Sequence, residues 1–282
     1  MSYIDRVLAT NPLAFYRLTT DGPPDDLIEG QTVIDATGNH DGVAHPEGGD
    51  LDEQATEAAW LTCREDEADQ LKALFVVGPN DPHITVSSSD FQFLNRDPFT
   101  VIFCLTDCYM QFIGVAETAG ILGTDDGSGG WSAYFYATEE DPPEGIAVLH
   151  VAFVRDGDTV SYLLNVRTGG GDLLGSARIY VVYNGTRLTM WAQSATSQPV
   201  IGAIQLDPIE QVDTTLSEGD LLDGGDLLIA SQDSWGTMGI APLSASLSHV
   251  IIYDRALTDL ELAYAASCEF GPVFLSGGVS PA

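Results

Sequence analysis

The segment SHVIIYDRALTDLELAYAA, residues 248–266, passes from a run of β-branched residues directly into a helix start. Val250, Ile251 and Ile252 favour a strand. Thr258 and Glu261 stand three residues apart, as in a capping box, and acidic residues favour the positive end of a helix. We therefore expect a last strand and then a short helix that docks on the body of the protein. Its expected apolar side consists of Leu260, Leu262, Ala263 and Tyr264.

The chain before this segment is a series of short apolar runs separated by Gly, Asp and Pro, which is typical of strands and turns. YIDRVLAT near the start predicts a short helix. The pair Asn184-Gly185 favours a type I′ hairpin turn. No P-loop, dinucleotide-binding glycines or βαβ alternation occurs. The expected strands are LAFYRL, ALFVV, HITVS, FTVIFCLTD, GILGT, WSAYFYAT, IAVLHVAFV, VSYLLNV, ARIYVVY, RLTMWAQ, DLLIASQ and SHVIIYD.

About a dozen short strands at regular spacing predict an all-β protein built as an antiparallel two-sheet sandwich, with short helices near both ends. No change of composition divides the chain into two folded units. We expect an N-terminal helical arm over residues 1–11, a sandwich domain over 12–267 and a tail over 268–282. Residues 45–72, acidic and rich in Ala, are expected to be a variable loop around a short strand.

The charge balance is the strongest global signal. Of 282 residues, 42 are acidic and 10 basic, giving a formal net charge of −32, and only one basic residue is Lys. Such a charge strains a compact fold in dilute salt, whereas molar salt reduces the Debye length to about 3 Å. The composition resembles that of a protein from a high-salt archaeal cytoplasm or its virus, and an ordinary acidic phage protein is the alternative. Binding to nucleic acid is disfavoured because no basic stripe is present.

Neither membrane insertion nor secretion is indicated. No apolar run approaches the roughly 18 residues of a membrane span, and MSYIDRVLATNP lacks the features of a signal peptide. The four cysteines form no C-x-x-C pair, which disfavours structural zinc. Cys104 and Cys108 are expected on one strand, too far apart for a mutual disulfide. We expect mainly that the cysteines are buried as small apolar residues. A disulfide that involves Cys63 or Cys268 is the alternative.

Three segments together resemble the concanavalin A-like lectin/glucanase superfamily, in the branch of laminin G-like domains found in phage and archaeal virus structural proteins. They are PLAFYRL (12–18) with DATGNHDG (35–42), PFTVIF (98–103), and HVIIYDRALTDLE (249–261). The resemblance covers roughly residues 12–267, and the last segment is the most specific. It implies a jelly roll with a concave face and rim loops for binding carbohydrate or protein surfaces. Some members of the superfamily bind calcium at the rim, and one branch hydrolyses β-glucans.

Catalysis is not expected. The glucanase branch needs two carboxylates about 5 Å apart on one strand face. Glu65, Glu67 and Asp69 have suitable spacing but lie in the acidic insertion without a flanking apolar strand. The five histidines are scattered, and no Ser-His-Asp or Cys-His pattern is suggested.

Calcium is the one cofactor considered. Asp125 and Asp126 precede Gly127-Ser128-Gly129-Gly130 between two expected strands and offer hard oxygen ligands. Weaker candidates are the pairs Asp156/Asp158 and Asp35/Asp41. Turn chemistry and the general acidic bias are the alternative explanation for all of these pairs.

Aromatic residues are the candidate ligand-binding groups. Tyr134 and Tyr136 share a strand face, with Trp131 nearby, and such a platform can stack a sugar ring. Core packing is the alternative for these three, and Trp191 and Trp235 are equally ambiguous.

The leading hypothesis is a non-enzymatic structural protein on the virion surface of a halophilic archaeal virus. It would act as a capsid decoration, turret or tail-fibre element that stabilises the particle, attaches to host glycan, or both. Expected partners are other virion proteins, further copies of the chain and a host surface glycan or glycoprotein. The alternatives are a glycan depolymerase and a cellular adhesion module. The apolar tail residues are candidates for an interface: Pro272, Val273, Phe274 and Leu275.

Overall fold

The computed structural model describes 15 parts of the chain. They are residues 3–16, 30–45, 60–62, 70–72, 74–76, 83–93, 97–110, 117–126, 129–137, 147–155, 158–165, 176–185, 188–194, 224–229 and 243–262.

Strands dominate this described part. The helical elements are α1 (Tyr3–Leu8), the 3₁₀ helix η1 (Ser89–Phe91) and a single turn at 259–262. The strands are β1 (Ala14–Tyr16), β2 (Thr32–Val33), β3 (Gly42–His45), β4 (Trp60–Thr62), β5 (Gln70–Lys72), β6 (Leu74–Val76), β7 (His83–Val86), β8 (Phe99–Met110), β9 (Glu117–Gly123), β10 (Trp131–Ala137), β11 (Ala147–Arg155), β12 (Asp158–Asn165), β13 (Ser176–Tyr183), β14 (Leu188–Ser194), β15 (Leu227–Ile229) and β16 (Leu243–Tyr253).

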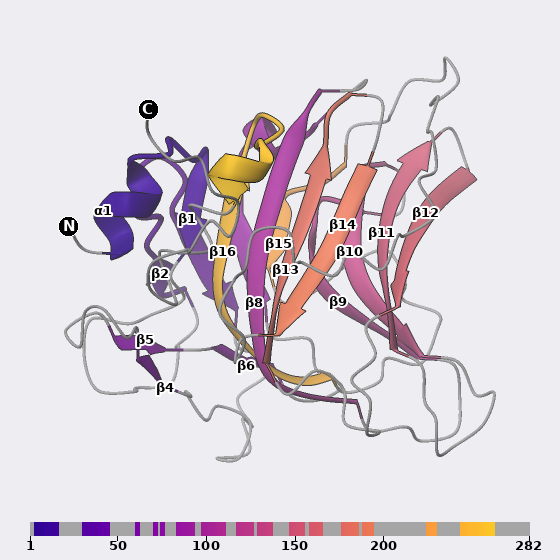
Figure 1. The fold of residues 1–282 in the computed structure, drawn as a ribbon, viewed down its shortest axis with the longest axis horizontal. Helices are drawn as coiled ribbons and strands as arrows, with labels where there is room; N and C mark the ends of the chain where they lie inside the picture. Colours follow the sequence, from indigo (N-terminus) through magenta and orange to yellow (C-terminus); the bar gives the residue numbers. More distant parts are fainter. Residues whose placement is uncertain are drawn as a thin grey trace, which may run out of the picture.

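The strands form two antiparallel sheets that lie one behind the other (Figure 1). Sheet A has the order β1-β16-β8-β13-β14, and β6 also pairs with β16. Sheet B has the order β12-β11-β10-β9-β15-β7-β3-β2, while β4 and β5 form a separate pair. The predicted all-β, two-sheet jelly-roll sandwich is confirmed, and so is the short N-terminal helix.

Where burial is described, strands β1, β8, β13 and β16 of sheet A are buried on both faces, which explains their nearly continuous apolar runs. In register across four strands, Phe15 faces Ile251, Ile251 faces Ile102, and Ile102 faces Tyr180. This row is covered on the outside by α1 and by the segment after β16, which contribute Val7, Leu257 and Leu262 to the same core cluster. The N-terminal helix and the closing segment are therefore joined to one face of one sheet.

A stack of aromatic rings joins the two sheets. Phe99 of β8 stacks on Phe93 at 4.7 Å between ring centres and on Trp131 of β10 at 5.7 Å. All three side chains are buried. This stack joins the two sheets close to the end of sheet B where the site described below lies.

The closing segment has the predicted capping box. Glu261 Oε2 accepts the backbone N–H of Thr258 at 2.8 Å, and Thr258 Oγ1 accepts the N–H of Glu261 at 3.4 Å. Arg255 donates to Glu261 Oε1 at 2.7 Å and to the Thr10 carbonyl oxygen at 3.0 Å, so the segment also holds the end of the first helix. The strand before it begins at Leu243, five residues earlier than predicted.

Two local expectations are wrong. Leu260 is 65% exposed while Leu262 is buried, because one helical turn docked by Leu257 and Leu262 leaves the intervening position facing solvent. Tyr183 pairs with Leu188, so a four-residue connection spans 184–187 in place of a two-residue turn. Of the pair Asn184-Gly185 only Gly185 has positive φ, at 90°, whereas a type I′ turn requires positive φ at both.

Among the described residues, no helix is long and apolar enough to cross a membrane. Residues 268–282 lie outside the described residues, so the predicted domain boundaries and the Pro272–Leu275 interface stay predictions.

Candidate functional site

Four loops come together at one end of sheet B, and we call this region the rim. It comprises residues 35–41 between β2 and β3, 87–93 after β7, 124–126 with 129–130 between β9 and β10, and 224–226 before β15. Antiparallel pairing places these loops at the same end, since Leu227 pairs with Val86 and Leu228 with Gly123.

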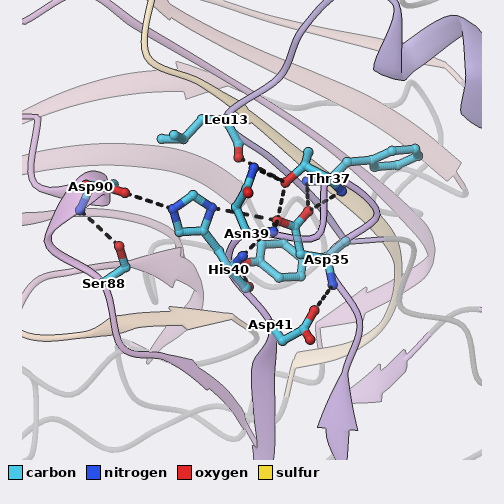
Figure 2. Close-up of polar contacts among 10 residues, drawn as sticks. Leu13, Asp35, Thr37, Asn39, His40, Asp41, Ser88 and Asp90 are labelled. Carbon is cyan, nitrogen blue, oxygen red and sulfur yellow. Dashed lines mark hydrogen bonds and ion pairs between the residues drawn. The ribbon is translucent and has the colours of Figure 1, made fainter.

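The first rim loop is organised by one buried carboxylate. Asp35 is 1% exposed, and its oxygens accept the backbone N–H groups of Phe15 at 2.8 Å, Thr37 at 3.0 Å and His40 at 3.1 Å. They also accept the Thr37 hydroxyl and, at 3.4 Å, the N–H of Asn39 (Figure 2). Because Phe15 belongs to β1 of sheet A, this carboxylate fastens a loop of sheet B to the opposite sheet.

Tyr16 and Asp41 complete the packing of that loop. Asp41 Oδ1 accepts the N–H of Asp35 at 2.9 Å, and the Tyr16 hydroxyl donates to the His40 carbonyl oxygen at 2.6 Å. Burial raises the pKa of Tyr16 far above its ordinary value, and the charges of Asp35 and Asp41 raise it further. The oxygens of the weaker calcium pair Asp35/Asp41 thus accept backbone N–H groups, which supports the turn-chemistry explanation for this pair.

His40 links the first loop to the second. Its Nε2 lies 2.9 Å from Asp90 Oδ2, and its Nδ1 lies 3.7 Å from Asp35 Oδ2, as Figure 2 shows. The His40 side chain is 8% exposed, whereas that of Asp90 is 59% exposed. The imidazole also packs edge-on against Phe91 at 5.0 Å. One carboxylate of the η1 helix is thereby held at the surface by a buried ring.

The loop at 224–226 is fixed by Gln92. Its amide nitrogen donates to the Gly225 carbonyl oxygen at 2.6 Å, and its amide oxygen accepts the Gly224 N–H at 2.9 Å. A Cβ atom at Gly224 would lie 2.0 Å from the Thr124 carbonyl oxygen, so a larger residue could not approach the neighbouring loop this closely. Ser87 donates to Asp226 at 2.7 Å.

The loop between β9 and β10 carries the predicted calcium ligands. Asp125 is buried and accepts a hydrogen bond from Ser132 at 3.4 Å. Asp126 is exposed and accepts the Gly129 N–H at 3.2 Å, which closes the hairpin turn. No group of three or more His, Cys, Asp or Glu able to hold a metal occurs among the described residues. Calcium at Asp125 and Asp126 stays a prediction.

The predicted aromatic platform is placed differently. Trp131 is 3% exposed and donates from Nε1 to the Phe91 carbonyl oxygen at 2.8 Å, and Tyr134 is 4% exposed. Their burial favours the core-packing alternative, because a ring that stacks on a sugar needs an open face. Tyr136 lies in β10, but its side chain is not among those that the structure describes.

Several other sequence candidates fall outside the described residues or side chains. Glu65, Glu67, Asp69, Asp156, Cys63, Cys268 and Trp235 are outside the described residues, and Trp191, Asp158, Cys104 and Cys108 lie in strands without described side chains. Conversely, sequence reasoning missed Asp90, Gln92 and Asp226 as rim residues. Nothing in their local sequence distinguishes them, because their partners lie 50 to 139 positions away.

What the rim offers chemically is a surface of fixed oxygen acceptors. Asn39, Asp41, Asp90, Asp126 and Asp226 are all exposed on backbone that buried groups hold in place. Carboxylate oxygens accept hydrogen bonds from hydroxyl groups or ligate hard cations.

Comparison with solved structures places the fold among known β-sandwiches. A botulinum neurotoxin type C structure matches with a TM-score of 0.57 and 10% identity over 92% of this chain and 51% of the other. The binding domain of botulinum neurotoxin serotype C1 matches with a TM-score of 0.52 and 8% identity over 91% and 51%. A mutant of Trypanosoma rangeli sialidase displaying trans-sialidase activity matches with a TM-score of 0.53 and 12% identity over 94% and 34%.

This chain spans about a third to a half of the length of those proteins, and identities this low show the fold alone. No family model matches the sequence, and no curated protein matches it.

Proposed function

We propose that this protein is a non-enzymatic recognition protein that binds a neutral, hydroxyl-rich glycan on the rim. The proposal rests on the exposed carboxylate and amide oxygens of the rim, whose backbone is held in place by buried groups. Sugar hydroxyls are donors that carboxylates and amides accept well, with charge-assisted bonds the stronger ones. A pre-organised surface loses little entropy when a ligand binds.

Charge defines the class of glycan. The exposed rim residues include four aspartates, and the whole chain carries a formal charge of −32. Like charges across an interface are costly, so carboxylated or sulfated sugars are disfavoured. Cell entry of botulinum neurotoxin type C depends on interaction with two ganglioside molecules, which supports glycan recognition as a use of this fold but not the neutral charge class proposed for this chain.

We further propose that the protein is carried on the virion surface of a halophilic archaeal virus, where the glycan would belong to the host envelope. The acidic composition and the resemblance to laminin G-like domains of viral structural proteins support this assignment. Attachment, particle stabilisation or both would follow from that position. Quantitative mass spectrometry of purified particles tests the assignment. Stoichiometric copies per particle are expected, and their absence would support a cellular adhesion module.

Calorimetric titration with envelope polysaccharide in molar KCl tests glycan binding. The double variant Asp126→Ala/Asp226→Ala should bind about tenfold more weakly or worse, as expected when two charged hydrogen-bonding groups are removed. The double variant Asp254→Ala/Asp259→Ala is the matched control, since it removes the same charge from exposed positions near the closing turn. Equal weakening in both variants would contradict a role of the rim.

Incubation of the protein with the same envelope polysaccharide tests for catalysis. A recognition protein leaves the polysaccharide intact, whereas a depolymerase releases reducing ends. Release that disappears on mutation of a carboxylate pair would replace this proposal with the hydrolase alternative.

A further inference from the structure

The end of sheet B opposite the rim carries two histidines on neighbouring strands. His45 is the last residue of β3, His83 is the first residue of β7, and the two face each other directly in the antiparallel register. Both residues are partly exposed, and they alternate with buried residues along their strands, such as Ala44 and Ile84. Their side chains therefore project from the outer face of the sheet.

The two imidazole rings are close enough to share a metal ion. Their centres are 5.0 Å apart and their planes are inclined by 30°. In a tetrahedral zinc site with metal–nitrogen distances of about 2.0–2.1 Å, the centres of two bound imidazoles lie about 5 Å apart. The observed ring separation is therefore compatible with coordination of one metal ion by both imidazoles.

We propose that His45 and His83 form a two-imidazole site for a borderline divalent transition metal such as Zn²⁺ or Cu²⁺. Imidazole nitrogen favours these ions, whereas Ca²⁺ and Mg²⁺ favour oxygen. The negative field of the chain raises the local concentration of any cation. Among the described residues, His45 and His83 belong to no group of three or more His, Cys, Asp or Glu able to hold a metal, so the proposed site has two protein ligands from this part of the chain.

Bound metal would fasten β3 to β7 at the end remote from the rim. In the described part of the chain these strands pair over three positions, Val43 with Thr85, Ala44 with Ile84 and His45 with His83. A cross-link at the last pair would add to a short ladder. Because the ligands must be neutral imidazoles, acid would weaken metal binding. The site is independent of the proposed glycan function.

Titration of the metal-free full chain with ZnCl₂ in molar KCl at neutral pH tests the proposal, with calorimetry and imidazole NMR signals as readouts. Wild type should show one saturable site, with the signals of His45 and His83 shifting together. His45→Asn and His83→Asn should each weaken Zn²⁺ binding about tenfold or more, since each removes one of two ligands. Thr85→Asn, on the same face and strand as His83, is the matched control and should bind normally.

Excess MgCl₂ distinguishes Zn²⁺ coordination by the two histidines from nonspecific attraction of divalent cations to the acidic surface. It should leave Zn²⁺ binding unchanged. Circular dichroism without metal checks that each variant is folded. Binding that survives in both histidine variants would overturn the proposal. So would imidazole signals that stay unshifted when wild-type chain is saturated with Zn²⁺, a readout that needs no variant to fold.

Discussion

Asp35 shows how much of the rim depends on one side chain. Its buried oxygens accept three backbone N–H groups at 3.1 Å or less, one from β1 of sheet A and two from the loop between β2 and β3 of sheet B. A carboxylate in this position replaces the backbone partners that a tight loop cannot supply to its own N–H groups. The geometry of residues 35–41, and with it the position of His40, follows from this residue.

Asp35→Asn should therefore destabilise the protein strongly. The amide keeps one acceptor and turns an NH₂ group toward N–H donors, so the free energy of unfolding should fall by about 2–4 kcal/mol. Denaturant unfolding measures the change. Asp254→Asn, at an exposed position, is the control and should stay within about 0.5 kcal/mol of wild type. Similar effects for the two variants would show that the Asp35 contacts contribute little.

Tyr16 predicts a loss of stability in alkali. Its pKa is raised far above the ordinary 10.0 in the folded protein, mainly by burial. Its contribution is complete below pH 10 and is lost as pH rises, because the unfolded chain ionises while the folded chain does not. The slope approaches about 1.4 kcal/mol per pH unit. Tyr16→Phe should remove this part of the slope in unfolding measured above pH 10. A slope that is unchanged in the variant would contradict the assignment.

At the scale of elements, the closing segment joins the last strand to the first helix. Thr100 of β8 donates from Oγ1 to the Arg255 carbonyl oxygen at 2.9 Å and accepts the Leu257 N–H at 2.9 Å. Together with the Arg255 contact to Thr10, these bonds hold the turn over the outer face of sheet A, as seen above β16 in Figure 1. Ala36 of the first rim loop packs against the same core cluster as Leu257 and Leu262, so the closing segment also supports the base of that loop.

The capping box predicts a contribution to the free energy of unfolding that is lost in acid. The pKa of Glu261 is lowered from 4.5, first by its hydrogen bond to the Thr258 N–H and also by Arg255. A lowered pKa means that the stabilisation is present above pH 4.5 and is lost as pH falls through the folded-state value. Glu261→Gln should be less stable than wild type at neutral pH, and the difference should shrink in acid. Thermal unfolding between neutral pH and pH 3 measures it, and a constant difference would argue against the cap.

The sequence predicted most elements because each is encoded locally. The strands and the Thr258–Glu261 cap follow from periodicity and spacing alone. The rim could not be predicted as an assembly, since the His40–Asp90 contact joins residues 50 positions apart. The burial of Trp131 could not be predicted either. The alternating pattern of its strand defines two faces but does not indicate which of them packs against sheet A. Only the sheet order placed that ring against Phe99.

At the scale of the whole molecule, the formal charge of −32 predicts that stability depends on salt concentration. Repulsion among carboxylates strains the fold in dilute buffer and is screened at a Debye length of about 3 Å in molar salt. The melting temperature should therefore rise from dilute buffer to molar KCl. Scanning calorimetry measures it, with sucrose as an uncharged control that cannot screen charges. A melting temperature independent of KCl would contradict adaptation to high salt.

The proposed function requires that the rim is the surface that binds glycan. Backbone amide NMR during titration with oligosaccharides from the host envelope tests this most directly. The account predicts saturable shifts concentrated at Asn39, Asp90, Asp126 and Asp226, with the signals of β3 and β7 near His45 and His83 unmoved. Shifts centred elsewhere on the sandwich, or none at saturating oligosaccharide, would contradict it.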